Sequence, residues 1–263
     1  FGTNYRLDGG ADDDALTVTG SSYSGYGLTD LSLEGGTGND TLSVSDSAFG
    51  DGNGAVADAT LSGGDGDDRM SASGVLRLTM TGGSGTDTFV LTAQQYKATQ
   101  ASYQFVTQQG TPENGWDQGN VTVAGKPIEI TDFVAGVGGD VLDIQDLLRN
   151  GAAGFDGSNP FGSAGYLRLV QSTTHPADTL LEFDVDGGGD GYITLAVLKN
   201  VIATHLVGAN FNPSYPTDGS EMAGVVIDGT GETDTLFGTA GGDTISGFDG
   251  NDVIDGDAGY DLI

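Results

Sequence analysis

The chain has 263 residues, with 38 acidic and 8 basic side chains, and its formal net charge at pH 7 is −30. This balance argues against nucleic acid as a partner, because no basic surface is available to neutralise phosphates. The chain has no cysteine, which excludes disulfides and thiolate metal sites. No apolar run is long enough to span a bilayer, so no membrane span is expected.

Glycine-rich turns recur in the first third of the chain. They read GGADDDALT, GGTGNDTLS, GGDGDDRMS and GGSGTDTFV. Apolar and polar residues alternate before and after each turn, which is typical of strands with one buried face. We therefore expect coils of two strands joined by a glycine turn, with the extra residues in far-side loops. The sixth position of the four turns is always an aspartate: Asp14, Asp40, Asp68 and Asp87.

The middle of the chain, residues 92–210, has a different character. A glutamine-rich stretch predicts a strand around 103–107 and an exposed loop with Trp116, which either contacts a partner or caps the end of the core. Ile128 and Ile130 indicate a strand, and Asp143 is placed to cap a short helix. Three further strands are expected at 166–171, 178–186 and 192–201.

An acidic loop, DVDGGGDG, follows the second of these strands. It offers Asp184, Asp186 and Asp190 as oxygen ligands for a cation, although an acidic hairpin turn is the simpler interpretation. Its spacing is not that of an EF-hand, because position twelve is Leu195.

A connector at 211–228 leads to nine-residue units that begin at Gly229: GTGETDTLF, GTAGGDTIS, GFDGNDVID and GDAGYDLI. A branched aliphatic residue stands at the eighth position of each unit, in phase with an aspartate at the sixth. A flexible linker has no reason to keep this phase, so the pattern predicts a solenoid with a cation at each turn. The four aspartates are Asp234, Asp243, Asp252 and Asp261.

Both sets of turns resemble the RTX repeat, GGxGxDxUx, of proteins exported by bacterial type I secretion. The resemblance implies an all-β fold, a parallel β-roll or β-solenoid of calcium-binding repeats with an intervening β-rich capping domain. Segment 127–151 resembles the segment that closes such a repeat block, and the strands after it resemble a type I secretion target domain. We therefore expect an N-terminal solenoid at 1–91, a cap at 92–210, a linker at 211–228 and a regular roll at 229–263 that continues beyond the chain.

The same resemblance implies where Ca²⁺ binds. Two aspartates one coil apart bracket each ion, which pairs Asp14 with Asp40, Asp40 with Asp68, Asp68 with Asp87, Asp234 with Asp252, and Asp243 with Asp261. This gives about five ions, bound only by oxygen. Asp140 and Asp143 are further candidate ligands. Backbone carbonyls complete the shells, at Gly10, Asp12, Gly35, Gly36, Thr37, Gly38, Gly63, Gly64, Asp65, Gly66, Gly82, Ser84, Thr230, Glu232, Thr239, Gly241, Gly247, Asp249, Gly256 and Ala258.

One turn departs from the pattern, because Asp12 stands where a glycine is expected. A positive φ is strained for most residues with a side chain, so the sequence indicates a cation site less strongly at this turn than at the others.

No catalytic motif is present, and His175 and His205 have no partnered cysteine, so we do not expect an enzyme. The expected function is a calcium-binding structural region of a secreted protein at the bacterial cell surface, of the surface-layer or adhesin type, which folds on Ca²⁺ after export. One alternative is the calcium-dependent folding and secretion tail of an exported enzyme or toxin. Another is a module that binds a cell-surface glycan or like subunits through far-side loops with Tyr23, Tyr26 and Phe49.

Overall fold

The computed structural model describes residues 4–20, 30–46, 56–109, 117–239, 241–256 and 261–263. It divides into two compact units. The first comprises Phe1–Gly151, Leu169–Glu182 and Thr194–Pro213. The second comprises Ala152–Arg168, Phe183–Ile193 and Ser214–Ile263. Trp116, Tyr23, Tyr26 and Phe49 lie outside the described residues, so the interpretations that rest on them stay predictions.

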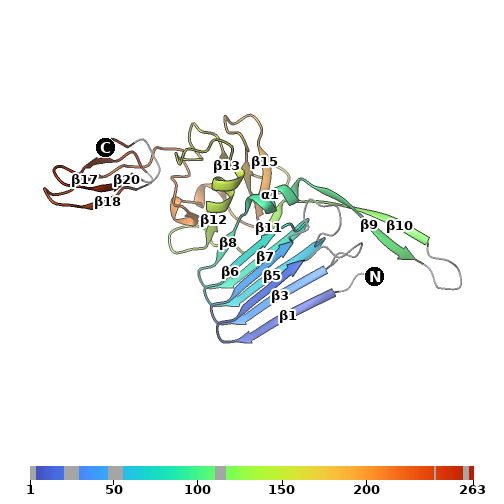
Figure 1. Ribbon diagram of the computed structural model, residues 1–263. Coiled ribbons are helices and arrows are strands. Elements are labelled where there is room, and N and C mark those ends of the chain that lie inside the picture. The colour runs from blue at the N-terminus through green and yellow to red at the C-terminus, as the bar shows by residue number, and fades with distance from the viewer. Residues whose placement is uncertain (1–3, 21–29, 47–55, 110–116, 240, 257–260) are drawn as a thin grey trace. The chain divides into compact units, whose positions relative to one another are not determined.

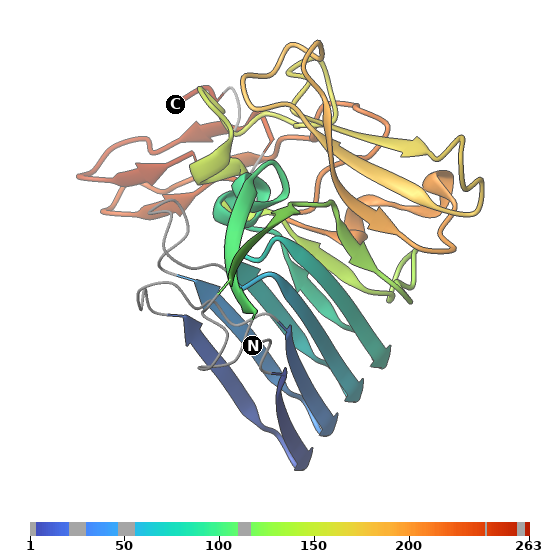
Figure 2. The same cartoon turned by 90° about the vertical axis from the view of Figure 1, so that its right-hand side faces the viewer.

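Two sheets of stacked strands form the first unit (Figure 1 and Figure 2). In one sheet, the strands that enter the glycine turns pair in parallel in the order β1 (Asn4–Ala11), β3 (Asp30–Thr37), β5 (Asp58–Asp65) and β7 (Arg77–Ser84). This sheet continues with β11 (Ile128–Ile130), β15 (Ile193–Leu198), β14 (Thr179–Phe183) and β13 (Leu167–Gln171). In the other sheet, the strands that leave the turns pair in the order β2 (Ala15–Gly20), β4 (Thr41–Asp46), β6 (Arg69–Ser73) and β8 (Thr88–Val90), followed by β12 (Val141–Asp143) and β16 (Phe211–Asn212). This arrangement is that of a β-roll-type repeat fold.

The inward side chains of the two sheets form the core of the roll. Leu33, Leu61 and Met80 are fully buried and lie in register on β3, β5 and β7. Each fully buried side chain of this kind contributes about 1.5–3 kcal/mol. Leu42 and Phe89 close the core from the other sheet. The alternation in the sequence therefore predicts the buried face of these strands correctly.

The described chain has an open edge at its first coil. Tyr5 and Leu7 belong to the inward row of β1, yet they are 51% and 40% exposed. Their exposure follows from the sheet order, because β1 is an edge strand of the described sheet.

Residues after 91 add further strands to both sheets. Helix α1 (Ala93–Thr99) and the hairpin of β9 (Ser102–Gln109) and β10 (Asp117–Ala124) come between β8 and β11. The α1 residue Gln95 is fully buried, and its amide bonds both the N–H and the carbonyl of Val75. Strand β9 confirms the strand predicted at 103–107. The division of the chain at 91, 210 and 228 stays a prediction.

The three strands predicted between 166 and 201 are also present. They are β13 (Leu167–Gln171), β14 (Thr179–Phe183) and β15. The helical turn expected after Asp143 is η1 (Leu147–Gly151), a π-helical turn that buries Leu147 and Leu148. Among the described residues, no helix has both the length and the apolar character needed to cross a membrane.

The second unit includes short strands from the nine-residue repeats. Strand β17 (Val226–Asp228) pairs in parallel with β19 (Thr244–Ser246), and β18 (Thr235–Phe237) pairs with β20 (Val253–Asp255). Ile227 lies beside Ile245, and Leu236 beside Ile254, so two repeats make one coil. Only Ile245 of these four is buried, at 2% exposure.

Candidate metal centre

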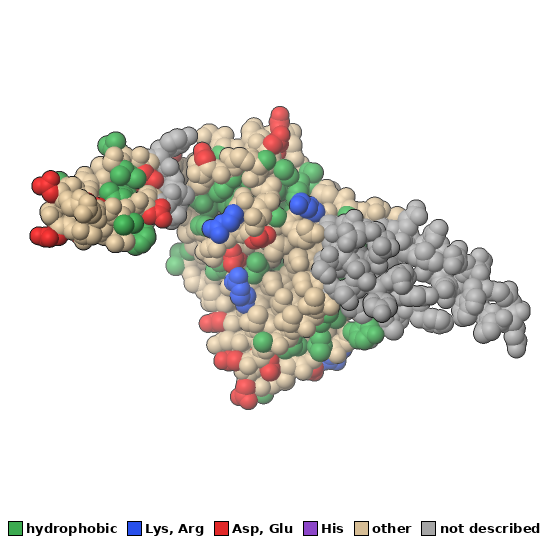
Figure 3. Space-filling model, viewed as in Figure 1, with side chains coloured by type: hydrophobic (Ala, Val, Ile, Leu, Met, Phe, Trp, Pro, Cys, Tyr) green, Lys and Arg blue, Asp and Glu red, His purple; other side chains and the backbone are tan. Residues whose placement is uncertain are grey.

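An aspartate ladder runs along the glycine-turn edge of the roll. It comprises Asp14, Asp40, Asp68, Asp87 and Asp140. The Oδ1 atom of each later member accepts the backbone N–H of the member one coil earlier, at distances of 2.8, 2.8, 2.9 and 2.9 Å in chain order. The structure therefore brings together the N-terminal aspartate pairs that the sequence predicts, and it adds Asp140 to them. Figure 3 shows acidic side chains along this edge.

The second oxygen of several ladder aspartates has no partner. The Oδ2 atoms of Asp14, Asp40 and Asp68 are buried and accept no hydrogen bond in the described structure. Asp40 and Asp68 are only 1% and 2% exposed. A buried charge without a partner is costly, and buried charges in proteins are normally paired or bound to a metal. These oxygens fit a cation.

Backbone carbonyls converge on the same places. A Cβ atom on Gly35 would lie 2.3 Å from Asp40 Oδ2 and 2.5 Å from the carbonyl oxygen of Gly63. A Cβ on Gly63 would lie 2.2 Å from Asp68 Oδ2 and 2.6 Å from the Gly82 carbonyl oxygen. The missing side chains thus leave a cradle in which a carboxylate faces a carbonyl of the next coil. A donor set made only of oxygen is the kind that Ca²⁺ prefers.

The second and fourth positions of the turns have the backbone conformation that the resemblance implies. Gly36 and Gly38 have φ of 114° and 127°. Asp12 also has a positive φ, 76°, although it replaces a glycine. Aspartate is one of the few residues that visit this region. The first turn therefore keeps the shape of the others.

The remaining N-terminal positions predicted as carbonyl ligands lie in the same turns. Thr37, Asp65 and Ser84 lie in register at the ends of β3, β5 and β7. Gly10, Gly64 and Gly66 have positive φ. Their role as calcium ligands stays a prediction.

A further aspartate at the Asp140 end of the ladder, Asp132, is not singled out by the repeat pattern. Asp132 accepts the N–H groups of Gly82 and Gly83 with its two oxygens, at 2.9 and 2.8 Å. Asp140 Oδ2 is also occupied, by the N–H of Val134 at 2.8 Å. Asp132 follows β11 at the place where earlier coils have their first glycine. An alignment of Ile128 and Ile130 with the buried residues of the earlier strands would have identified Asp132 as a turn residue.

A neutral side chain follows the ladder. Asn210 is fully buried and uses its whole amide group. Its Nδ2 donates to the carbonyls of Gly136 and Asp140, and its Oδ1 accepts from Gly136 N and Val207 N. This end of the roll therefore satisfies its polar groups without adding a charge. No periodic signal marks Asn210 in the sequence.

Burial raises the pKa of three ladder carboxylates, Asp68, Asp87 and Asp140. Burial, together with the charges of Asp140, Asp68 and Asp132, raises the pKa of Asp87 to about 6, against backbone hydrogen bonding that lowers it. Burial is also the main reason why the pKa values of Asp68 and Asp140 are raised. The calcium-free roll therefore favours a proton or a cation at these groups.

The C-terminal repeats pair their aspartates in the same way but satisfy them differently. Asp234 N donates to Asp252 Oδ1, and Asp243 N to Asp261 Oδ1, each at 2.9 Å. Here Thr230 donates its N–H and hydroxyl to Asp234 Oδ2, at 2.6 and 2.8 Å.

Thr239 contacts Asp243 in the same manner, and its backbone N–H is the main reason why the pKa of Asp243 is lowered. A cation must therefore compete with threonine at these two carboxylates.

Other predicted C-terminal ligands lie in the same turns. A Cβ on Gly247 would lie 2.5 Å from Asp252 Oδ2, and one on Gly256 would lie 2.3 Å from Asp261 Oδ2. The Glu232 carbonyl faces Gly250, which has a φ of 136°. Gly241 is buried and Asp249 exposed. Ala258 lies outside the described residues.

Asp143 is not part of the ladder. Its Oδ2 pairs with Arg69 Nη2 at 2.7 Å, and its Oδ1 accepts the N–H of Gln145 at 3.3 Å. The second contact resembles the helix-capping role that the sequence suggests. The structure therefore does not bring Asp143 to the cradles.

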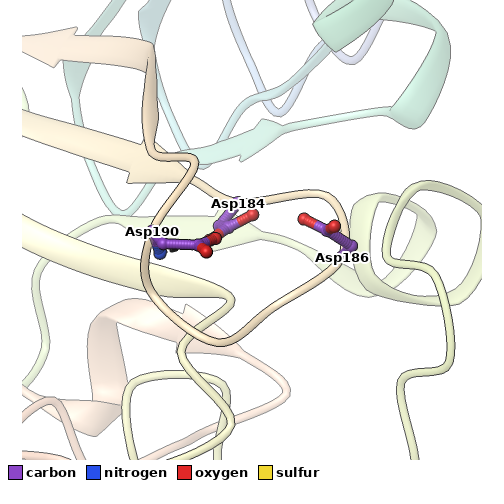
Figure 4. A group of neighbouring side chains, drawn as sticks. All are labelled: Asp184, Asp186 and Asp190. Atoms are coloured by element: carbon purple, nitrogen blue, oxygen red, sulfur yellow. Dashed lines mark hydrogen bonds between the residues drawn. The ribbon is translucent and has the colours of Figure 1, made fainter.

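The acidic loop of the second unit gathers three carboxylates. Asp184, Asp186 and Asp190 have oxygen atoms within 4.8 Å of one another, and Figure 4 shows the side chains pointing toward each other. Asp184 is buried, which by itself raises its pKa. Hydrogen bonds, first from the Gly191 N–H, outweigh burial and leave the pKa lowered. The loop can hold a cation, but its most buried carboxylate is already satisfied.

Comparison with known families matches the repeats. The profile of the RTX calcium-binding nonapeptide repeat, with four copies, matches residues 32–47, 58–74 and 228–263. These ranges contain Asp40, Asp68 and the C-terminal aspartates. A search of curated proteins finds no significant match. The chain thus carries RTX calcium-binding repeats, which are typical of secreted proteins.

Replacement of Asp40 by Asn tests the orphaned oxygen. Asn keeps an acceptor for Asp14 N but removes the buried charge, so the stability gained on adding calcium should fall by ~1–3 kcal/mol. Melting temperatures over a series of Ca²⁺ concentrations measure this gain, with Asp8→Asn, exposed and off the ladder, as control. An undiminished calcium gain would contradict this role for Asp40.

The raised pKa of Asp87 predicts a pH dependence without calcium. The folded-state pKa of about 6 lies above the unfolded value, so the folded state binds more protons between the two values. The folded fraction of the calcium-free chain should therefore fall as pH rises from about 4 to 6 and change little above that range. Far-UV circular dichroism in chelator, followed against pH, measures it as a loss of β structure. In Asp87→Asn the slope should be smaller; the same slope in both proteins would assign it to other groups.

The threonine contacts predict weaker C-terminal sites. Thr230→Val with Thr239→Val keeps the side-chain shape but removes both hydroxyl donors. Because one hydrogen bond contributes ~0.5–1.5 kcal/mol, calcium affinity there should rise severalfold and calcium-free order should decrease. Amide NMR shifts of residues 229–256 against calcium concentration report both. An unchanged or lower affinity would show that the hydroxyls do not compete with calcium.

Proposed function

We propose that this chain is a calcium-dependent structural region of a secreted bacterial cell-surface protein, of the surface-layer or adhesin type. The single observation that carries the proposal is the buried, unpartnered Oδ2 atom of Asp14, Asp40 and Asp68. Three orphaned charges in successive coils have a simple partner in Ca²⁺. The matched RTX repeats support the same ion.

The charge of the chain explains why folding follows export. A net charge of −30 opposes compaction when no cation is bound. Each bound Ca²⁺ removes about two charges and ties neighbouring coils together. Sites with Kd of ~10⁻⁴–10⁻³ M stay empty in the cytoplasm and fill outside the cell, where binding to the folded state alone stabilises it.

A structural role is proposed in preference to a catalytic one. The ladder carboxylates hold backbone N–H groups of the neighbouring coil and lie on a repeating edge, so they bind coil to coil. The far-side insertions vary in length while the ladder stays in register, as expected of a repeat scaffold.

A calcium titration of chelator-stripped protein tests the proposal. Far-UV circular dichroism should show a cooperative transition from coil to β structure with Ca²⁺, and none with Mg²⁺ at the same concentration, because Mg²⁺ demands a tighter octahedral shell. The radius of gyration from X-ray scattering should fall in parallel. A compact, β-rich protein in chelator would contradict calcium-dependent folding.

A further inference from the structure

A polar pocket lies on the outer face of the roll, away from the aspartate ladder. It has a volume of about 220 Å³. It is formed where β6 begins, where β8 and β12 end, and by the η1 segment. Its lining residues are Arg69, Val90, Asp143, Gln145, Asp146, Arg149 and Asn150.

The pocket places two arginines beside two aspartates, so its formal charge is balanced although the protein as a whole is acidic. Two of the eight basic side chains of the chain, Arg69 and Arg149, line it. Arg149 is exposed and makes no hydrogen bond or ion pair with any residue that the structure describes. Arg69 is half-exposed and uses one nitrogen for Asp143. Most of their N–H donors therefore remain available.

Both carboxylates of the pocket are already occupied. Asp143 binds Arg69 and the N–H of Gln145. Asp146 accepts from Ala93 N at 2.9 Å and from Asn150 Nδ2 at 2.7 Å. The groups of the pocket that remain able to hydrogen-bond a ligand are thus the guanidinium N–H donors and two amide oxygens, Gln145 Oε1 and Asn150 Oδ1.

We propose that this pocket binds a sugar acid, with the carboxylate on Arg149 and Arg69 and the hydroxyl groups on Gln145 and Asn150. A guanidinium matches a carboxylate with two parallel hydrogen bonds. The amide oxygens need donors, which hydroxyls supply and a bare anion lacks. The volume lies below the ~300–1,000 Å³ typical of drug-sized ligands and suits one ring. Val90 offers an apolar surface to its C–H groups.

The charge of the protein restricts the form of this ligand. A net charge of −30 repels a long polyanion. A single carboxylate on an otherwise neutral sugar avoids this penalty. The sugar can be free or part of a glycan chain, since both present the same groups.

Titration calorimetry with D-glucuronate, at fixed saturating Ca²⁺, tests the site. We expect a Kd of about 1 mM, and binding at least tenfold weaker for glucose, which lacks the charge, and for acetate, which lacks the hydroxyls. Methyl glucuronoside separates the two sources: equal affinity indicates a sugar within a glycan, and lost affinity a free acid. Equal binding of glucose or acetate, or no glucuronate binding, would overturn the proposal.

Arg149→Gln is the decisive variant, because Arg149 has no hydrogen-bond or ion-pair partner among the described residues, so its loss should not affect folding. Affinity for glucuronate should fall at least tenfold, and Arg149→Lys should lie between, since Lys keeps the charge but loses the planar fork. Arg6→Gln, which removes an equal charge from β1, should bind normally. Unchanged affinity in Arg149→Gln would reject the site. The calcium response of Arg149→Gln should be unchanged, so this test is independent of calcium-dependent folding.

Discussion

Repulsion between stacked carboxylates is the constraint on which this fold depends. A parallel, in-register stack places equivalent residues one strand spacing apart, about 4.8 Å. The register that aligns Leu33, Leu61 and Met80 in the core also aligns Asp40, Asp68 and Asp87 at the edge. At an effective dielectric constant of 20, two such charges repel by about 3 kcal/mol. The core therefore forms only if the edge charges are neutralised.

The end of the ladder at Asp140 shows how the stack of carboxylates is terminated. Asp132 takes two backbone N–H groups of the preceding turn, and Asn210 satisfies the next coil with a neutral amide. Backbone donors and an amide thus replace what a further cation would supply. In the C-terminal repeats, the hydroxyl groups of Thr230 and Thr239 donate hydrogen bonds to the aspartates of their own turns. The chain thus satisfies the polar groups of its turns with cation sites, with backbone and threonine donors, and with a neutral amide.

The repeats were predictable because their physics is local and periodic. Alternation before and after each turn predicts the buried rows, and fixed offsets predict which aspartates meet. Asp132 and Asn210 escaped prediction because each acts once, where the period breaks. Their roles depend on which strands pair with β7 and β12. The alternation of Ile128 and Ile130 is a signal for the pairing of β11 with β7, but no short pattern in the sequence specifies the pairing of β16 with β12. The extra coils after residue 91 were missed for the same reason.

The pairing of Asp143 with Arg69 makes the same point. Asp140 and Asp143 are both candidate ligands in the sequence. Asp140 lies at the turn edge, however, whereas Asp143, three residues later, lies at the end of β12. Asp140 continues the ladder, and Asp143 forms an ion pair with Arg69. Only the three-dimensional register distinguishes them.

A crystal structure of the chain grown in Ca²⁺, with anomalous diffraction data, tests the central claim most directly. The account predicts anomalous peaks between successive coils, each bordered by a ladder Oδ2 atom and by carbonyls of the glycine turns, at Asp14, Asp40 and Asp68. Ordered coils whose cradles hold no calcium would contradict it, because the orphaned carboxylates would then be stabilised by something other than the ion.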